Sequence, residues 1–147
     1  MYLKKGSVIL LGLIISTSLL ANRINRRHSI KNITEAMMQL DKVYSDKNKI
    51  EIFEMSESEY ITKSRFSIGL WIRYRWGLSQ GSKLSKYFND LGIFHPNDMS
   101  VIIVQCYYRH LHHQDLELNK LVSYYQERRK NMQKTDDKRE KAAKSIL

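Results

Sequence analysis

The chain has 147 residues, of which 42% are apolar and 27% charged, and its formal net charge is +10. This composition excludes a wholly disordered chain and a polytopic membrane protein, while one Pro and six Gly argue against a turn-rich sandwich or barrel. A single cysteine, Cys106, excludes an intramolecular disulfide and a cysteine-based zinc site.

The positive charge lies at the two ends of the chain. Residues 1–31 contain six Lys and Arg and no acid, and residues 127–147 contain eight Lys and Arg and four acids. Residues 32–126 contain eleven of each sign and are neutral. Because a folded nucleic-acid binder concentrates positive charge on a face of its domain, we expect no specific nucleic-acid partner. The basic ends suit anionic lipid or simple solvation.

The first 21 residues predict delivery to a membrane or to the cell envelope. A basic start is followed by an uncharged run of sixteen residues, 6–21, which ends in small and polar residues, as in a secretory signal. The alternatives are an uncleaved membrane anchor, whose orientation stays open, and a buried or surface helix. As a helix the run spans about 24 Å against a roughly 30 Å hydrocarbon core, a gap that bilayer thinning can cover. Residues 22–31 form a basic linker.

Residues 32–126 predict one compact, mainly α-helical domain, which a charged tail follows at 127–147. Apolar spacing and capping residues predict a helix over 34–44, another over 46–55 with Ile50 and Phe53 on its inner side, and a third from residue 56. The tail is expected to be an exposed helix or disordered.

Glycines and a proline divide the second half of this domain. A helix is predicted from Ser82 to Leu91, where Gly92 ends it, and Pro96 opens the next helix, which runs to residue 111. The β-branched run 101–104 also fits a short buried strand. Leu116 and Leu118 suggest an extended stretch before a last helix, whose inner face carries Leu121, Val122 and Tyr125.

An aromatic segment with interleaved arginines, residues 66–76, is the first candidate binding site. Trp71, Arg73 and Trp76 fit an aromatic-walled pocket for an anionic ligand, because Arg stacks on rings and binds carboxylates in a fork. The competing interpretation, which we favour, is a Trp-rich core in which Arg73 pairs with a buried acid such as Asp98 or Asp90.

Asp98 and His95 at the start of a helix form the second candidate. A His beside a carboxylate suits a general base, whereas the favoured interpretation is that both side chains cap free N–H groups of the helix. Arg109 completes a rival hypothesis of an enzyme or small-ligand site around Arg73, His95, Asp98 and Arg109.

The remaining reactive side chains predict no catalytic set, no metal site and no cofactor. His110, His112 and His113 lie near Asp115 at a predicted helix end, where His also suits the helix dipole. Cys106 has no neighbouring cation in the sequence and is expected to be a buried structural residue.

Three stretches carry a resemblance to a known family. They are Phe66–Arg73, Gly81–Leu84 with Tyr87 and Phe88, and Gly92–Ile103. They resemble an uncharacterised bacterial domain of unknown function, common in Bacteroidetes-type genomes, with the pattern F-x-x-G-x-W-I-R, then S-x-L-x-x-Y-F, then G-x-x-H-P-x-D-M-S-x-I-I. The resemblance covers about residues 32–125 and implies no activity. The chain departs from the family pattern at four positions: Ser67, Tyr74, Asn97 and Tyr108.

We therefore predict an envelope or membrane-anchored helical module that binds a partner and catalyses nothing. Its membrane contact is residues 6–21, and a protein partner is favoured over a small molecule. The candidate binding residues are Trp71, Arg73, Trp76, His95, Asp98 and Arg109.

Overall fold

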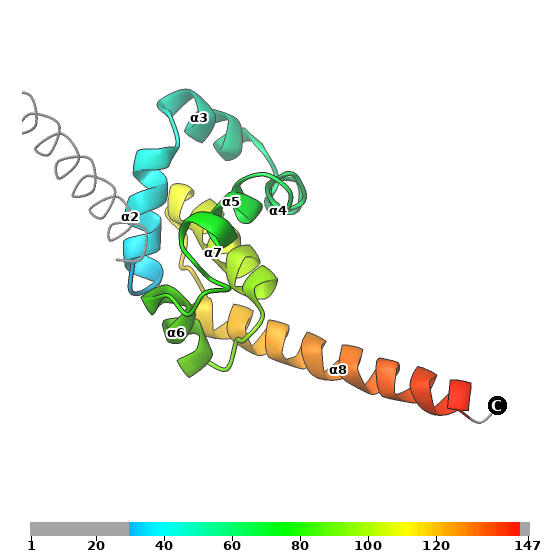
Figure 1. Ribbon diagram of the computed structural model, residues 1–147. Coiled ribbons are helices and arrows are strands. Elements are labelled where there is room, and N and C mark those ends of the chain that lie inside the picture. The colour runs from blue at the N-terminus through cyan, green and yellow to red at the C-terminus, as the bar shows by residue number, and fades with distance from the viewer. Residues whose placement is uncertain (1–29, 145–147) are drawn as a thin grey trace, which may run out of the picture.

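The computed structural model describes residues 30–144, which fold into seven helices without a strand (Figure 1). The helices are α2 (Ile33–Val43), α3 (Asp46–Glu54), α4 (Glu57–Ser64), α5 (Ile68–Arg75), α6 (Lys83–Asp90), α7 (Pro96–Leu111) and α8 (Leu118–Lys144). The predicted mainly α-helical class is confirmed. The predicted membrane segment, residues 1–21, and nearly all of the linker, 22–31, lie outside the described residues.

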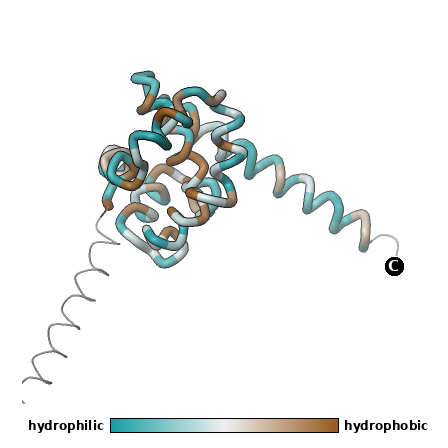
Figure 2. The backbone as a smooth tube through the Cα atoms, turned by 90° about the horizontal axis from the view of Figure 1, so that it is seen from above, coloured by the Kyte–Doolittle hydropathy of each residue, from teal (hydrophilic) through white to brown (hydrophobic). Residues whose placement is uncertain are grey.

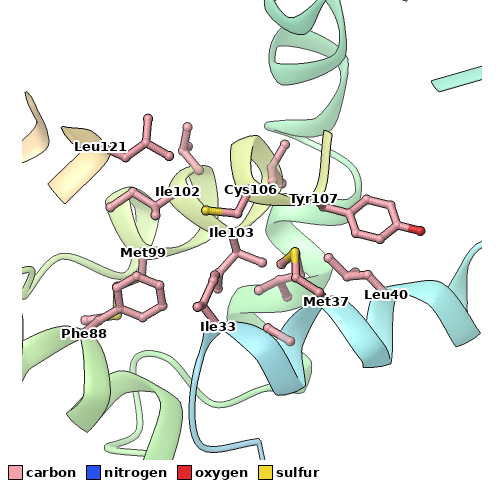
Figure 3. Packing of buried hydrophobic residues seen from close by; sticks show 14 of the residues in the cluster. Ile33, Met37, Leu40, Phe88, Met99, Ile102, Ile103, Cys106, Tyr107 and Leu121 are labelled. Atoms are coloured by element: carbon pink, nitrogen blue, oxygen red, sulfur yellow. The ribbon is translucent and has the colours of Figure 1, made fainter. Parts of the chain in front are cut away.

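Helix α7 is the centre of the domain, because each of the other six helices contacts it. Its run Val101–Val104 is buried, and it is helical rather than a strand. Pro96 at the first helical position and the His95 cap start the helix ahead of this β-branched run. Packing of the other helices on α7 then overrides the local strand preference of the run. Figure 3 shows Ile103 and Tyr107 of α7 pointing toward α2.

Helix α2 supplies the facing apolar stripe, which carries Ile33, Met37 and Leu40 (Figure 3). These residues recur every three or four positions and are at most 7% exposed, as the helical spacing predicts. The Asn32 side chain caps the helix by accepting a hydrogen bond from the Glu35 N–H at 2.9 Å. Serine caps start α3, α4 and α6 in the same way.

The inner face of α3 differs from the prediction. Ile50 and Phe53 are 60% and 55% exposed, and Ile52 is the buried residue instead, at 4%. Phe53 lies at the surface of the domain, where its ring stacks on that of His112 with centroids 4.4 Å apart. Only one residue of this short helix is buried, so the spacing of its apolar residues in the sequence does not predict which side of the helix faces the core.

The connection into α8 also differs from the prediction, because Leu116 and Leu118 form no extended stretch. The Asp115 carboxylate accepts a hydrogen bond from the Glu117 N–H at 2.8 Å, and Glu117 takes a positive φ of 49°. This turn leads directly into α8 at Leu118. Leu121, Val122 and Tyr125 then pack on the body, as predicted.

Helix α8 continues past the body as an exposed helix (Figures 1 and 2). It has 27 residues, and every residue from Asn131 to Lys144 is exposed. The expectation for this tail left helix and disorder open, and the chain is helical to Lys144. Of the helices described here, none combines the length and the apolar character that crossing a bilayer requires.

Candidate functional site

A groove lies between α8 and the turn that joins α6 to α7; we call it the α8 groove. Its volume is about 600 Å³, a size that suits a short peptide segment or a drug-sized molecule. One wall comes from the turn and the start of α7: Gly92, Ile93, Phe94, His95, Pro96 and Asp98. The other wall comes from α8: Tyr125, Gln126, Arg129, Lys130 and Gln133.

The turn wall is built by residues that end one helix and start the next. Gly92 has φ +76°, a conformation that favours glycine, and the Ile93 N–H donates to the Phe88 carbonyl at 2.9 Å. His95 caps α7 by accepting a hydrogen bond from the Asn97 N–H at 3.2 Å, which confirms its predicted capping role. Phe94 between them is 73% exposed, so the turn presents an aromatic ring to solvent.

A buried ion pair joins the two walls. The Asp98 side chain is 2% exposed, and the Arg129 guanidinium donates from Nε to its Oδ2 at 2.5 Å. This hydrogen bond raises the pKa of Arg129 above its usual value. The second oxygen, Oδ1, is buried without a hydrogen bond and lies 3.6 Å from an Arg128 nitrogen. The predicted capping role of Asp98 is therefore wrong, because its carboxylate faces α8 instead of backbone N–H groups.

Two further hydrogen bonds hold α8 against the end of α6 and against α7. Gln126 donates from Nε2 to the Leu91 carbonyl at 2.8 Å, and the Tyr125 hydroxyl donates to Gln105 Oε1 at 3.1 Å. Burial raises the pKa of Tyr125 to about 12, so the hydroxyl keeps its proton at neutral pH. The α8 wall is thus fixed to α7 and to the end of α6.

The charge around the groove is positive. Arg129 and Lys130 line the groove, Arg128 lies 3.6 Å from Asp98 Oδ1 outside the lining, and Asp98 supplies one buried carboxylate. The aromatic and aliphatic parts of Phe94, Ile93 and Tyr125 form the apolar lining. This combination suits a ligand with an apolar body and a carboxylate or another anionic group.

Arg73, a predicted site residue, pairs with neither Asp98 nor Asp90. Its NH1 donates to Ser100 Oγ at 2.9 Å and to Asn97 Oδ1 at 3.3 Å, so the prediction of a buried acid as its partner is wrong. The contact fastens the end of α5 to the start of α7. Both partners are uncharged, and Arg73 lies half-buried beside α7.

Both tryptophans belong to the core instead of the groove. Trp76 is 5% exposed and Trp71 is half-buried, with their rings edge to face at 5.9 Å. The interpretation of a Trp-containing core is confirmed. The aromatic segment is nevertheless split, because Phe66 and Tyr74 are 81% and 74% exposed.

Arg109 lies at the other end of α7 from His95 and Asp98. Its Nε donates to Glu57 at 3.2 Å, and its NH1 donates to the Leu116 carbonyl and to Glu117. Asp98 and Arg109 are eleven positions apart in the helix, about 16 Å along the axis. The structure therefore does not bring the four residues of the rival hypothesis into one pocket. Of the four, only His95 and Asp98 line the α8 groove.

His110, His112 and Cys106 have structural roles in the fold. His110 lies 2.9 Å from Asp41, and both ring nitrogens of His112 face backbone carbonyls. Cys106 is fully buried, and burial raises the pKa of its thiol to about 12, so the expectation of a buried structural cysteine is confirmed. Within residues 30–144, no three His, Cys, Asp or Glu side chains gather in a way that holds a metal ion.

Sequence analysis missed most of the α8 wall, since it assigned Arg129, Lys130 and Gln133 to the tail. A signal was present: Val122, Tyr125 and Arg129 follow one another at helical spacing, so the face that packs on the body continues past residue 126. A second hollow, of about 580 Å³, is lined by α8 residues alone. It is the side of one helix and joins no second element, so we do not treat it as a site.

Comparison with known proteins identifies one family. The family described as Domain of unknown function (DUF6794) matches residues 31–111, which comprise α2 to α7. Neither the curated proteins nor the solved structures gave a match. The matched segment contains Asp98 and the turn wall, whereas α8 and its arginines follow it.

Proposed function

The chain belongs to the DUF6794 family, a domain of unknown function, and we propose that it is a non-catalytic binding module whose α8 groove takes an apolar segment with a carboxylate from a protein partner. The observation that carries the proposal is the groove itself, with an exposed ring on one wall and cations on the other.

Phe94 is the central contact of this proposal. A ring that is 73% exposed at the mouth of a groove is an anchor for a partner, because aromatic side chains that become buried dominate the energy of protein interfaces. Pro96 and the hydrogen bonds from the Gly92 and Ile93 N–H groups to carbonyls of α6 hold the turn, so little conformational entropy is lost on binding.

The cations give the groove a preference for acidic partners. Arg129 is 34% exposed although it pairs with Asp98, and Lys130 is exposed beside it. A partner carboxylate in the groove can pair with the Arg129 guanidinium, whose positive charge Asp98 neutralises only in part. Electrostatic attraction of this kind mainly increases the association rate and the specificity.

The positions of the reactive side chains support binding over catalysis. His95 uses Nδ1 to cap α7, and the Asp98 carboxylate is committed to Arg129. A general base needs a carboxylate or an imidazole that reaches the substrate proton. Placement at a membrane or in the envelope through residues 6–21 is a part of the proposal that stands on the sequence alone.

A photo-crosslinker tests the proposal. We replace Phe94 with a photoreactive phenylalanine analogue in cells that express the full chain, and we use Phe66 as the matched control, since it is a phenylalanine at 81% exposure outside the groove. We expect a discrete crosslinked protein from position 94 that Lys130→Glu weakens, and none of the same mass from position 66. The same product from both positions, or adducts of small molecules only, contradicts the proposal.

A further inference from the structure

The outer face of α8 carries a row of lysines. Lys130, Lys134, Lys138 and Lys141 follow one another at intervals of four, four and three residues, so they lie along one side of the helix. All four are exposed. We call them the lysine row.

Most of the lysine row faces away from the body, and only Lys130, at its start, also lines the α8 groove. Each helical residue turns by about 100°, which puts the row roughly opposite the side with Leu121 and Tyr125, and these two residues are 6% and 7% exposed. Beyond the body, Figures 1 and 2 show no other helix of residues 30–144 beside α8. The row is therefore open to a large, flat partner.

The lysines of the row keep their charge available. None of them has an ion-pair partner among residues 30–144, whereas Arg139 pairs with Asp136 and Lys144 with Glu140. Glu127 and Asp137 border the row, and its balance remains positive. Two of the four acids of this segment, Asp136 and Glu140, are thus paired on other sides of the helix.

We infer that the lysine row is a binding surface for anionic phospholipid headgroups. The row extends about 16 Å along the axis, which suits a planar array of negative charges better than a small anion. Each ammonium group near such a surface adds attraction within about one Debye length, roughly 8–10 Å. The inference depends on the proposed membrane placement but not on the α8 groove.

Lipid is favoured over nucleic acid by the composition of this surface. The row contains lysines and no aromatic side chain on which a base stacks, and the body of the protein is neutral. The uncharged residues 6–21 are joined to the same chain and supply a route to a bilayer.

The test measures the height of α8 above a membrane. The full chain with Asn131→Cys carries one fluorescent donor, because Cys106 is fully buried and stays unlabelled. We reconstitute it into vesicles of phosphatidylcholine alone or mixed with phosphatidylglycerol, with an acceptor dye on the lipid. The row variant changes Lys134, Lys138 and Lys141 to Glu and leaves Lys130 in the groove. The control variant, with equal net charge, changes three exposed lysines on other helices: Lys42, Lys83 and Lys86.

We expect energy transfer about twofold or more higher with phosphatidylglycerol than without it, and a fall to the neutral-lipid level when salt rises to about 1 M. The row variant should stay at the neutral-lipid level, and the control variant should behave like the parent chain. Equal transfer on both lipids, an equal loss in the control variant, or tighter binding to duplex DNA than to the vesicles overturns the inference. If the chain does not float with either vesicle, the membrane placement fails too, whereas the groove is judged separately by the Phe94 crosslink.

Discussion

Arg129→Ala tests the ion pair that holds α8 on the body. In the folded protein the Asp98 carboxylate is 2% exposed and receives its hydrogen bond from Arg129 at 2.5 Å. Without that guanidinium, the nearest cation is Arg128, at 3.6 Å from the other oxygen. The variant therefore leaves a buried negative charge that is only partly compensated.

The expected loss follows from the burial of the two partners. Removing one partner of a fully buried pair costs about 3–5 kcal/mol. Arg129 is 34% exposed and Arg128 remains close, so water and the second cation reduce the cost to about 2–3 kcal/mol. Asp98→Asn leaves no buried charge and should cost about 1–2 kcal/mol. The double variant should cost about 1–2 kcal/mol less than the sum of the two.

Urea unfolding followed by the fluorescence of the buried Trp76 measures these differences. Arg139→Ala is the matched control, since this arginine is 79% exposed and its ion pair with Asp136 is 3.9 Å long, and it should change the free energy of unfolding by less than about 0.5 kcal/mol. If Arg129→Ala is as mild as Arg139→Ala, or if the two single losses are additive, the ion pair does not hold α8 and the reasoning is refuted.

Gly92 and Cys106 give further tests of the packing of the helices. Gly92→Ala places a Cβ 2.5 Å from Gln126 Nε2 at a φ of +76°, so it should lower the free energy of unfolding by about 1–3 kcal/mol, and a change below about 0.5 kcal/mol speaks against this turn geometry. The buried Cys106 thiol should resist a disulfide reagent at pH 8 in the folded chain and react fully in urea, and rapid native reaction contradicts its burial. Burial raises the pKa of the Cys106 thiol to about 12, so the folded state keeps the proton that the unfolded thiol loses near pH 8.5. The contribution of this thiol to the free energy of unfolding is therefore intact below about pH 8.5 and declines as the pH rises toward 12.

Local signals in the sequence predicted the helices well, because capping residues act over a few positions. Asn32, Ser56 and Ser82 accept hydrogen bonds from N–H groups three residues ahead, and Gly92 ends α6 with a positive φ. The errors arose where long-range packing decides. Ile50 lies on an apolar position of α3, and only the placement of that short helix against α7 exposes it.

The groove was beyond the sequence for a related reason. His95 and Asp98 were recognised as neighbours at a helix start, but the partner of Asp98 lies 31 residues further on, in a segment whose charge resembles a solvated tail. No local pattern shows which of several arginines reaches a buried carboxylate. The partners of Arg109 were equally beyond local sequence patterns, because its acid partners come from α4 and from the turn before α8.

Hydrogen exchange of the full chain with the protein captured at position 94 is the most direct test of binding in the α8 groove. On adding this partner, amides in residues 92–98 and 126–133 should exchange more slowly, while those of α5 stay unchanged. Slower exchange around Phe66 and Tyr74 with no change beside Phe94 would contradict the account, because it would place the partner on a different surface of the protein.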